Sequence, residues 1–133
     1  MCRPGDIIII KNFKDELGSS VDKHSFIVID NKKYITSNMM CSFHDDIQKE
    51  KKLKYYGNYE IDSSFISGSG INDKNGYIKI DKLYYFDKDK TDYRVIAHID
   101  IKLLNKIYKN LLGLSIKGRL KLVDSNIKIW YNK

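Results

Sequence analysis

Residues 25–37 read SFIVIDNKKYITS, and this stretch decides the fold class. Ser25 to Ile29 is an apolar, largely β-branched run, which favours a buried strand. Tyr34 to Ser37 is a second run of this kind, and the Asp30-Asn31 pair before it is typical of a turn. The stretch therefore predicts two strands joined by a turn.

Other apolar runs predict further strands. Pro4-Gly5-Asp6 is a turn signal, and the run Ile7–Ile10 after it is typical of a buried strand. Tyr77–Asp81 alternates between apolar and polar side chains, which indicates a half-buried strand. The remaining predicted strands are Tyr59–Ile61, Leu83–Phe86, and a terminal hairpin of Leu120–Val123 and Ile127–Tyr131 around Asp124-Ser125-Asn126.

One segment has the periodicity of a helix. The apolar residues that recur there at spacings of three and four are Ile101, Leu104, Ile107, Tyr108, Leu111 and Leu112. Asp100 is a suitable N-cap, and Gly113 is a natural C-cap. We therefore expect a helix over residues 101–112 in an α+β domain.

Composition narrows the class of protein. The 133 residues are enough for a single domain, and 42% hydrophobic with 31% charged residues is an ordinary globular composition. Cys2 and Cys41 have no CxxC partner, so we expect reduced thiols and no zinc site. Neither a signal-peptide pattern nor a membrane-spanning run is found, which predicts a cytoplasmic protein.

The net charge of +7 favours polyanionic partners, although an excess of lysine also serves solubility. The densest run of cations contains Lys49, Lys51, Lys52 and Lys54, and Tyr55 and Tyr56 follow it. Cations interleaved with aromatic rings are typical of proteins that bind single-stranded nucleic acid. The alternative is a solvated charged segment, which forms either a short helix or a loop.

Three segments, in this order, resemble the MazF/PemK family of toxin endoribonucleases. Pro4-Gly5-Asp6-Ile7-Ile8 is similar to the start of the family and its first strand. Lys23 to Ile29 is similar to its Arg-Pro-Val-hydrophobic strand, and Gly76 to Leu83 with Asp87 to a later strand that ends in Asp. The segment Leu111 to Leu114 resembles part of its C-terminal helix.

The resemblance implies a small SH3-like, MazF/PemK-type, partly open antiparallel β-barrel with a C-terminal helix. We expect one domain over residues 1–133, with a family-like core at 1–114 and an extension at 115–133 that forms the extra hairpin. The resemblance also implies a homodimer that binds single-stranded RNA and is inhibited by a small antitoxin protein. Cleavage would proceed by attack of the ribose 2′-OH on the phosphodiester, with neither a metal nor another cofactor.

The resemblance, together with the run of cations and aromatic rings at residues 49–56, assigns roles to residues of this chain. His24 and Ser25 stand where the family has Arg-Pro, and Lys79 stands where some members have Arg. The expected catalytic residues are His24, Thr36, Lys79 and Asp81. The expected RNA-binding residues are Lys23, Ser37, His44, Lys49, Lys51, Lys52, Lys54, Tyr55, Tyr56 and Asn75.

Two interpretations of His24 stay open, because histidine titrates near neutrality. It is either a charged phosphate clamp or a neutral general base, the latter with His44 as a possible acid. The departures from the family at His24 and Ser25 also favour a second hypothesis, a non-catalytic nucleic-acid- or protein-binding module on the same barrel.

Overall fold

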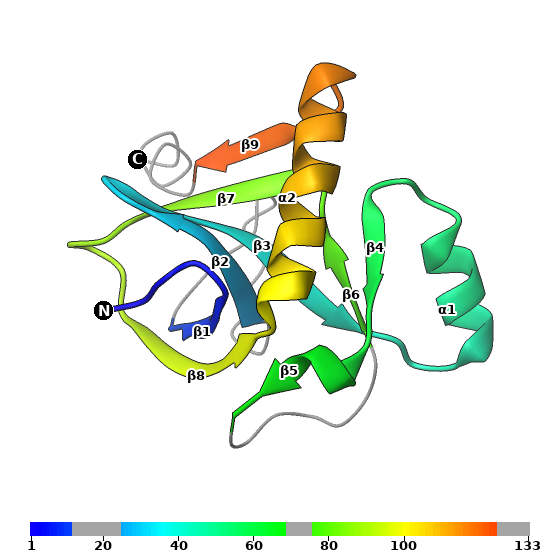
Figure 1. The fold of residues 1–133 in the computed structure, drawn as a ribbon, viewed down its shortest axis with the longest axis horizontal. Coiled ribbons are helices and arrows are strands. Elements are labelled where there is room, and N and C mark those ends of the chain that lie inside the picture. The colour runs from blue at the N-terminus through cyan, green and yellow to red at the C-terminus, as the bar shows by residue number, and fades with distance from the viewer. Residues whose placement is uncertain (12–24, 69–75, 125–133) are drawn as a thin grey trace.

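The computed structural model describes residues 1–11, 25–68 and 76–124. Within these ranges the chain forms nine strands, two α-helices and one turn of 3-10 helix (Figure 1). The strands are β1 (Asp6–Ile10), β2 (Ser25–Asn31), β3 (Tyr34–Ser42), β4 (Asn58–Ile61), β5 (Ile66–Ser67), β6 (Gly76–Lys79), β7 (Lys82–Asp87), β8 (Tyr93–Ile99) and β9 (Lys121–Asp124). The helices are α1 (Asp46–Leu53) and α2 (Ile101–Ile116), and the 3-10 turn is Ser63–Phe65.

The nine strands form one sheet, in which the main path runs β4-β6-β3-β2-β1-β8-β5. The long strand β3 changes partner along its length, because Tyr34–Ser37 pairs with β7 and Met40–Ser42 pairs with β6. Every pairing is antiparallel except that of β7 with β9. The expected α+β class is confirmed. The sheet of the described strands is not closed, so an SH3-like barrel stays a prediction.

Strand β1 shows why an unbroken isoleucine run forms a strand in this fold. Ile7 is buried in the core beneath α2, whereas Ile8 and Ile10 are buried in a second core on the opposite face of the sheet. Successive side chains of a strand point to opposite faces. A strand that is covered on both faces therefore needs apolar side chains at consecutive positions.

Helix α2 covers the first core. Asp100 is its N-cap, as predicted, and its carboxylate accepts a hydrogen bond from the backbone N–H of Lys102 at 2.7 Å. We expected the helix to end at Gly113, but it continues to Ile116. Leu114 packs against the core and extends the apolar face by a turn. The left-handed position after the helix is taken by Gly118, whose φ is +67°.

The second core lies on the face of the sheet away from α2. Its centre is Phe26, whose ring lies 5.6 Å from that of Tyr84 and 5.3 Å from that of Phe86. These rings are almost completely buried. Aromatic pairs at such distances add stabilisation beyond the area that they bury.

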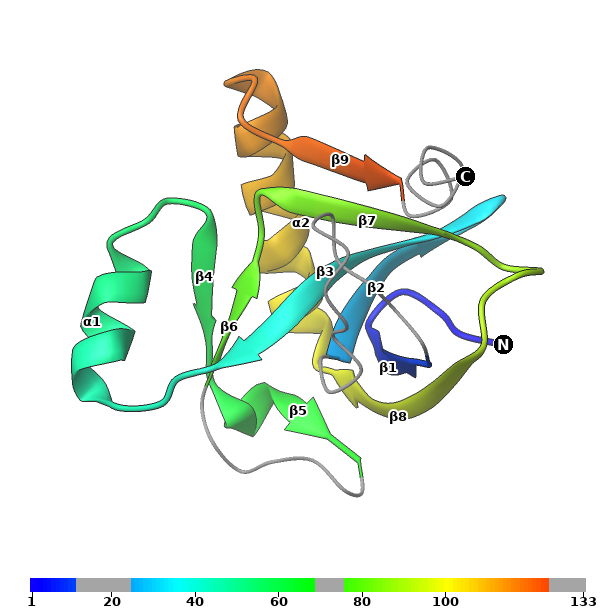
Figure 2. The same cartoon turned by 180° about the vertical axis from the view of Figure 1, so that it is seen from behind.

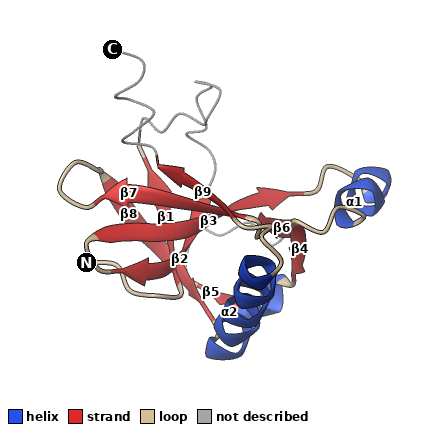
Figure 3. Cartoon of the chain, turned by 90° about the horizontal axis from the view of Figure 1, so that it is seen from above, coloured by secondary structure: helices blue, strands red, loops and turns tan. Residues whose placement is uncertain are grey.

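The basic segment after β3 is a helix, which decides between the two structures left open by the sequence. Asp45 is the N-cap of α1, and its carboxylate accepts from the backbone N–H of Gln48 at 2.7 Å. The side chain of Gln48 in turn accepts from the backbone N–H of His44, the residue before the N-cap, at 2.6 Å, so two side chain–backbone hydrogen bonds fix the start of the helix. No residue of α1 is buried. Figure 3 shows α1 projecting beyond the β4–β6 side of the sheet, away from α2.

The C-terminal extension, residues 115–133, begins with the last residues of α2 and continues into a strand of the main sheet. Strand β9 pairs in parallel with β7, with Lys121 opposite Lys82 and Val123 opposite Tyr84. The two strands lie side by side in both views of the sheet (Figures 1 and 2). The second strand of the expected hairpin, Ile127–Tyr131, lies outside the described residues. Neither described helix is long and apolar enough to cross a membrane.

Candidate nucleic-acid interface

Three of the predicted site residues, Lys23, His24 and Asn75, lie outside the described residues. Thr36 and Ser37, the two predicted hydroxyl residues, are adjacent in β3, so they point to opposite faces of the sheet. Ser37 pairs with Tyr84 and is completely buried, and its Oγ has no hydrogen-bond partner among the described residues. Thr36 is half-buried on the other face. The two hydroxyls therefore do not form one phosphate-binding pair.

Lys79, the last residue of β6, lies beside the thiol of Cys41. Burial raises the pKa of the Cys41 thiol, and the positive charges of Lys79 and Lys52 partly oppose that rise. Burial also raises the pKa of Tyr77, which stands opposite Cys41 in the sheet, to about 12. A thiol with a raised pKa is a poor nucleophile at neutral pH. Cys41 therefore remains a neutral thiol at neutral pH and offers no negative charge to Lys79.

Asp81 lies in the turn between β6 and β7, and its side chain is 1% exposed. Its carboxylate accepts a hydrogen bond from the hydroxyl of Tyr55 at 2.5 Å, and this bond is the main reason that the pKa of Tyr55 is raised. Gly57 packs so closely that a Cβ there would lie 2.4 Å from Cγ of Asp81. The backbone carbonyl of Asp81 accepts from the N–H of Lys121 at 2.7 Å. In this arrangement Asp81 holds Tyr55 in place.

The cations of α1 are accompanied by acidic residues. Residues 44–56 contain four lysines and three carboxylates, and His44 before the helix is exposed. Lys49 forms an ion pair with Glu60 at 2.9 Å, and its ammonium lies 5.8 Å from the centre of the Phe43 ring. Both the hydrogen bond to Glu60 and its charge raise the pKa of Lys49. Much of the positive charge of α1 is therefore balanced locally.

The segment from α2 to β9 has a different charge pattern. Residues 101–123 contain six cations and no carboxylate. The side chains of the cations are exposed, and they are Lys102, Lys106, Lys109, Lys117, Arg119 and Lys121. Four of them, Lys102, Lys106, Lys109 and Lys117, are spaced by four, three and eight residues, so they follow one face of the helix. We call these four lysines the basic stripe.

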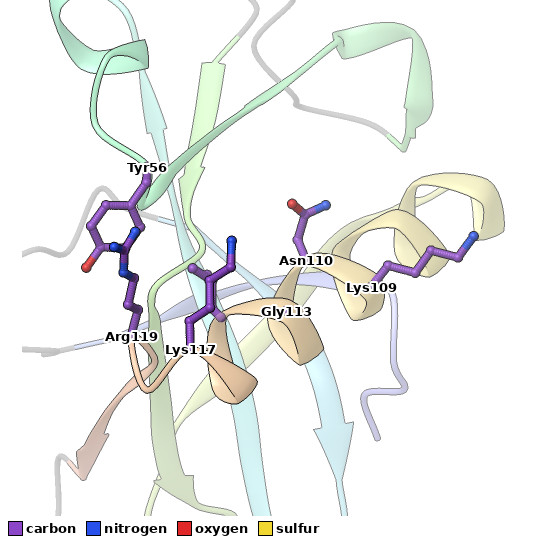
Figure 4. Close-up of a pocket in the computed structure, with 7 residues that line it drawn as sticks. Tyr56, Lys109, Asn110, Gly113, Lys117 and Arg119 are labelled. Atoms are coloured by element: carbon purple, nitrogen blue, oxygen red, sulfur yellow. The ribbon is translucent and has the colours of Figure 1, made fainter.

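A pocket of about 350 Å³ opens at the C-terminal end of the basic stripe. Its lining residues come from the α1–β4 connection, from α2 and from the turn after α2. They are Tyr56, Lys109, Asn110, Gly113, Leu114, Lys117 and Arg119. We call it the Gly113 pocket. Figure 4 shows Tyr56 and Arg119 side by side at one end, with Lys109 at the other.

Tyr56 and Arg119 form the aromatic end of the Gly113 pocket. The guanidinium of Arg119 lies 4.9 Å from the centre of the Tyr56 ring, which is a favourable cation–π distance. The ring of Tyr55, the preceding residue, lies 4.7 Å from that of Tyr56. Because Tyr55 is bound to Asp81, this series of contacts connects the buried turn of the sheet to the surface pocket.

Sequence reasoning identified Tyr55 and Tyr56 but not the cations that line the pocket together with Tyr56. Lys109, Lys117 and Arg119 were overlooked because they are scattered among apolar helix positions. The absence of any carboxylate over residues 101–123 was the signal that could have revealed them. Within the described ranges, no three His, Cys, Asp or Glu side chains are grouped as metal ligands.

Comparison with models of known protein families finds no match for this chain. A search of curated proteins likewise finds no similar sequence.

Proposed function

We propose that this protein binds single-stranded RNA along the basic stripe of α2. The observation that carries the proposal is the run of six exposed cations over residues 101–123 without a carboxylate, which ends at an aromatic pocket. Each phosphate that a lysine neutralises releases counterions, which makes binding favourable without sequence readout. The solubility interpretation predicts dispersed, mixed charges instead.

The aromatic groups favour a single strand over a duplex. Tyr55 and Tyr56 are 42% and 47% exposed, which is unusual for rings that only fill a core. Unpaired bases stack on such rings and on guanidinium planes, whereas the bases of a duplex are already stacked on each other. The exposed tyrosines and Arg119 therefore supply a platform for bases next to cations for the backbone.

The test is the salt dependence of binding to a labelled, unstructured RNA. Replacing Lys102, Lys109 and Lys117 with Ala should weaken binding and lower the slope of log affinity against log salt by about 2, since each phosphate contact on a single strand contributes about 0.7. The matched control replaces Lys32, Lys33 and Lys90, which are exposed cations in the β2–β3 and β7–β8 turns. An equal effect of both triple variants would mean that only net charge matters.

Cleavage of the bound RNA, inhibition by an antitoxin and homodimer formation are further proposals that rest on the family resemblance. Of the expected catalytic residues, His24 lies outside the described residues and Asp81 is buried against Tyr55. Incubation of the protein with long RNA in EDTA separates the endoribonuclease hypothesis from the non-catalytic binding module. Fragments from the parent protein support the endoribonuclease, whereas binding without fragments supports the non-catalytic module.

A further inference from the structure

The Gly113 pocket has properties that a general phosphate-binding surface does not need. Gly113 stands in the basic stripe, between Lys109 and Lys117, at a position where the helix could carry another side chain. A Cβ at Gly113 would have no heavy atom within 4 Å, so packing does not require glycine there. Glycine inside a helix is less stable than alanine, because it loses more conformational freedom on folding. The glycine leaves open the space above the helix backbone.

The groups around this space match the parts of one nucleotide. At one end, Arg119 and Tyr56 offer a flat cationic and aromatic surface for a base. Lys117 and Lys109 supply positive charge along the pocket, and the amide of Asn110 both donates and accepts hydrogen bonds. A volume of about 350 Å³ is at the lower end of the range of small-ligand sites. It fits one nucleotide unit rather than a longer segment.

The helix C-terminus, which carries partial negative charge, does not oppose an anion here. The carbonyls of Leu114 and Ser115 accept from the N–H groups of Arg119 and Gly118 at 2.8 and 3.0 Å. Lys117 and Arg119 also compensate this end of the helix dipole. Lys109 lies two turns before the end of the helix, so the dipole does not explain its presence at the pocket.

We infer that the Gly113 pocket holds one nucleotide of the RNA strand, with its base against Arg119 and Tyr56 and its phosphate on Lys117, while Lys109, whose side chain points away from these groups in Figure 4, meets the next phosphate of the strand. This inference rests on the proposed function, because the basic stripe would lead the strand into the pocket. A free nucleoside monophosphate has the same base and phosphate. The experiment therefore includes both ligands.

The decisive variant is Gly113→Glu, which places a carboxylate in the pocket. Its matched control is Ser115→Glu, which makes the same charge change on the same helix. Ser115 is exposed and does not line the pocket, and a residue two positions further along points to the opposite side of a helix. Circular dichroism should show that both variants are folded. Binding of an unstructured RNA and of AMP is then measured for the parent and both variants.

We expect Gly113→Glu to weaken RNA binding at least tenfold more than Ser115→Glu, and to abolish the weaker binding of AMP. Equal weakening by the two variants would overturn the pocket assignment while leaving RNA binding by the basic stripe intact. A parent that binds AMP through the pocket but binds no RNA would overturn the proposed function and assign the pocket to free nucleotides. Equal binding of inorganic phosphate and AMP would overturn the role of Tyr56 and Arg119 in holding a base.

Discussion

A single buried carboxylate links the sheet to the surface site. Asp81 was expected to act on RNA, but its side chain is 1% exposed and accepts the hydroxyl of Tyr55. An ionisable group in such a position must keep its hydrogen-bond partner, because an unsatisfied buried group is costly. Gly57 leaves just enough room for this contact. The Asp81–Tyr55 bond therefore holds the segment that presents Tyr56.

Replacing Tyr55 with Phe removes this hydrogen bond and little else. We expect a loss of about 1–2 kcal/mol in the free energy of unfolding at neutral pH. This value is at the lower end of the range for hydrogen bonds to charged groups, because the ring of Tyr55 is partly exposed. Urea denaturation measures it, with Tyr34→Phe, another exposed tyrosine, as the control. An unchanged stability would contradict a structural role for the bond.

The raised pKa of Tyr55 also predicts how this difference depends on pH. A group with a raised pKa in the folded state stabilises the protein fully below its unfolded pKa of about 10. Above that pH the unfolded tyrosine ionises while the folded one stays protonated, so the contribution is lost. The gap between parent and Tyr55→Phe should therefore be constant up to about pH 9 and narrow above pH 10. A gap that widens there would contradict the assignment.

If the protein cleaves RNA, His24 separates two mechanisms. A phosphate clamp must be charged, so His24→Arg should retain cleavage and remove any decline of the rate as pH rises through about 6.5. A general base must be neutral, so the same change should abolish cleavage, because Arg does not accept a proton. RNA binding is the control and should survive. Parent-like cleavage by both His24→Arg and His24→Ala would exclude His24 from the mechanism.

Helix α2 combines a structural face with a proposed binding face. Leu103, Leu104, Ile107 and Leu111 are buried in the core, whereas the basic stripe faces solvent. The two faces follow from the helical period, since positions three and four apart share a side. Gly113 lies on the solvent-facing stripe, where its lack of a side chain affects the pocket and not the core.

Gly113→Ala tests whether the glycine lowers the stability of α2. The added methyl group meets no atom within 4 Å, and the position is helical. We expect stabilisation by about 0.5–1 kcal/mol, because alanine loses less conformational entropy than glycine. Thermal and urea unfolding measure the change. Destabilisation would mean that the space above Gly113 is not open.

The lysines of α1 are expected to contribute less to RNA binding than the basic stripe. Replacing Lys49, Lys51, Lys52 and Lys54 with Ala should lower the salt slope by less than the triple change in α2 does. Lys49 is paired with Glu60, and three carboxylates accompany the four lysines. A paired cation releases fewer counterions when RNA binds. A larger effect from α1 would move the RNA path to that helix.

For the molecule as a whole, the sheet separates two apolar cores. One lies beneath α2, and the other lies around Phe26 on the opposite face. The remaining apolar surface of α2 is exposed: Ile101, Leu112 and Ile116 are 64%, 63% and 78% accessible. Large exposed apolar side chains that share a helix face are common where proteins associate.

The expected homodimer stays a prediction, and these side chains allow it to be tested. Light scattering should give the mass of a dimer at micromolar concentration, and Leu112→Glu should shift it toward the monomer if α2 lies in the interface. Asn110→Glu makes the same charge change two positions earlier, on the opposite side of the helix, and serves as the control. A parent that is monomeric under these conditions would contradict the dimer.

Local patterns in the chain were enough to place most strands and α2. The isoleucine run, the hairpin at residues 25–37 and the apolar helix face depend only on neighbouring side chains, and all three predictions are confirmed in type. Strand β8 was overlooked, because Arg94 and His98 interrupt its apolar pattern while exposed at the surface. The predicted turn at Asp30-Asn31 was wrong by two residues, since both belong to β2 and the chain turns at Lys32-Lys33.

Long-range contacts decided the rest. The position of Asp81 depends on Tyr55, which is 26 residues away in the sequence. The parallel pairing of β9 with β7 depends on where helix α2 ends. The Gly113 pocket joins Tyr56 to residues 109–119, which no local pattern connects. Periodicity reports which side of an element is buried, but not which distant element covers it. Tertiary packing therefore brought Tyr56, two lysines and Arg119 together around one pocket.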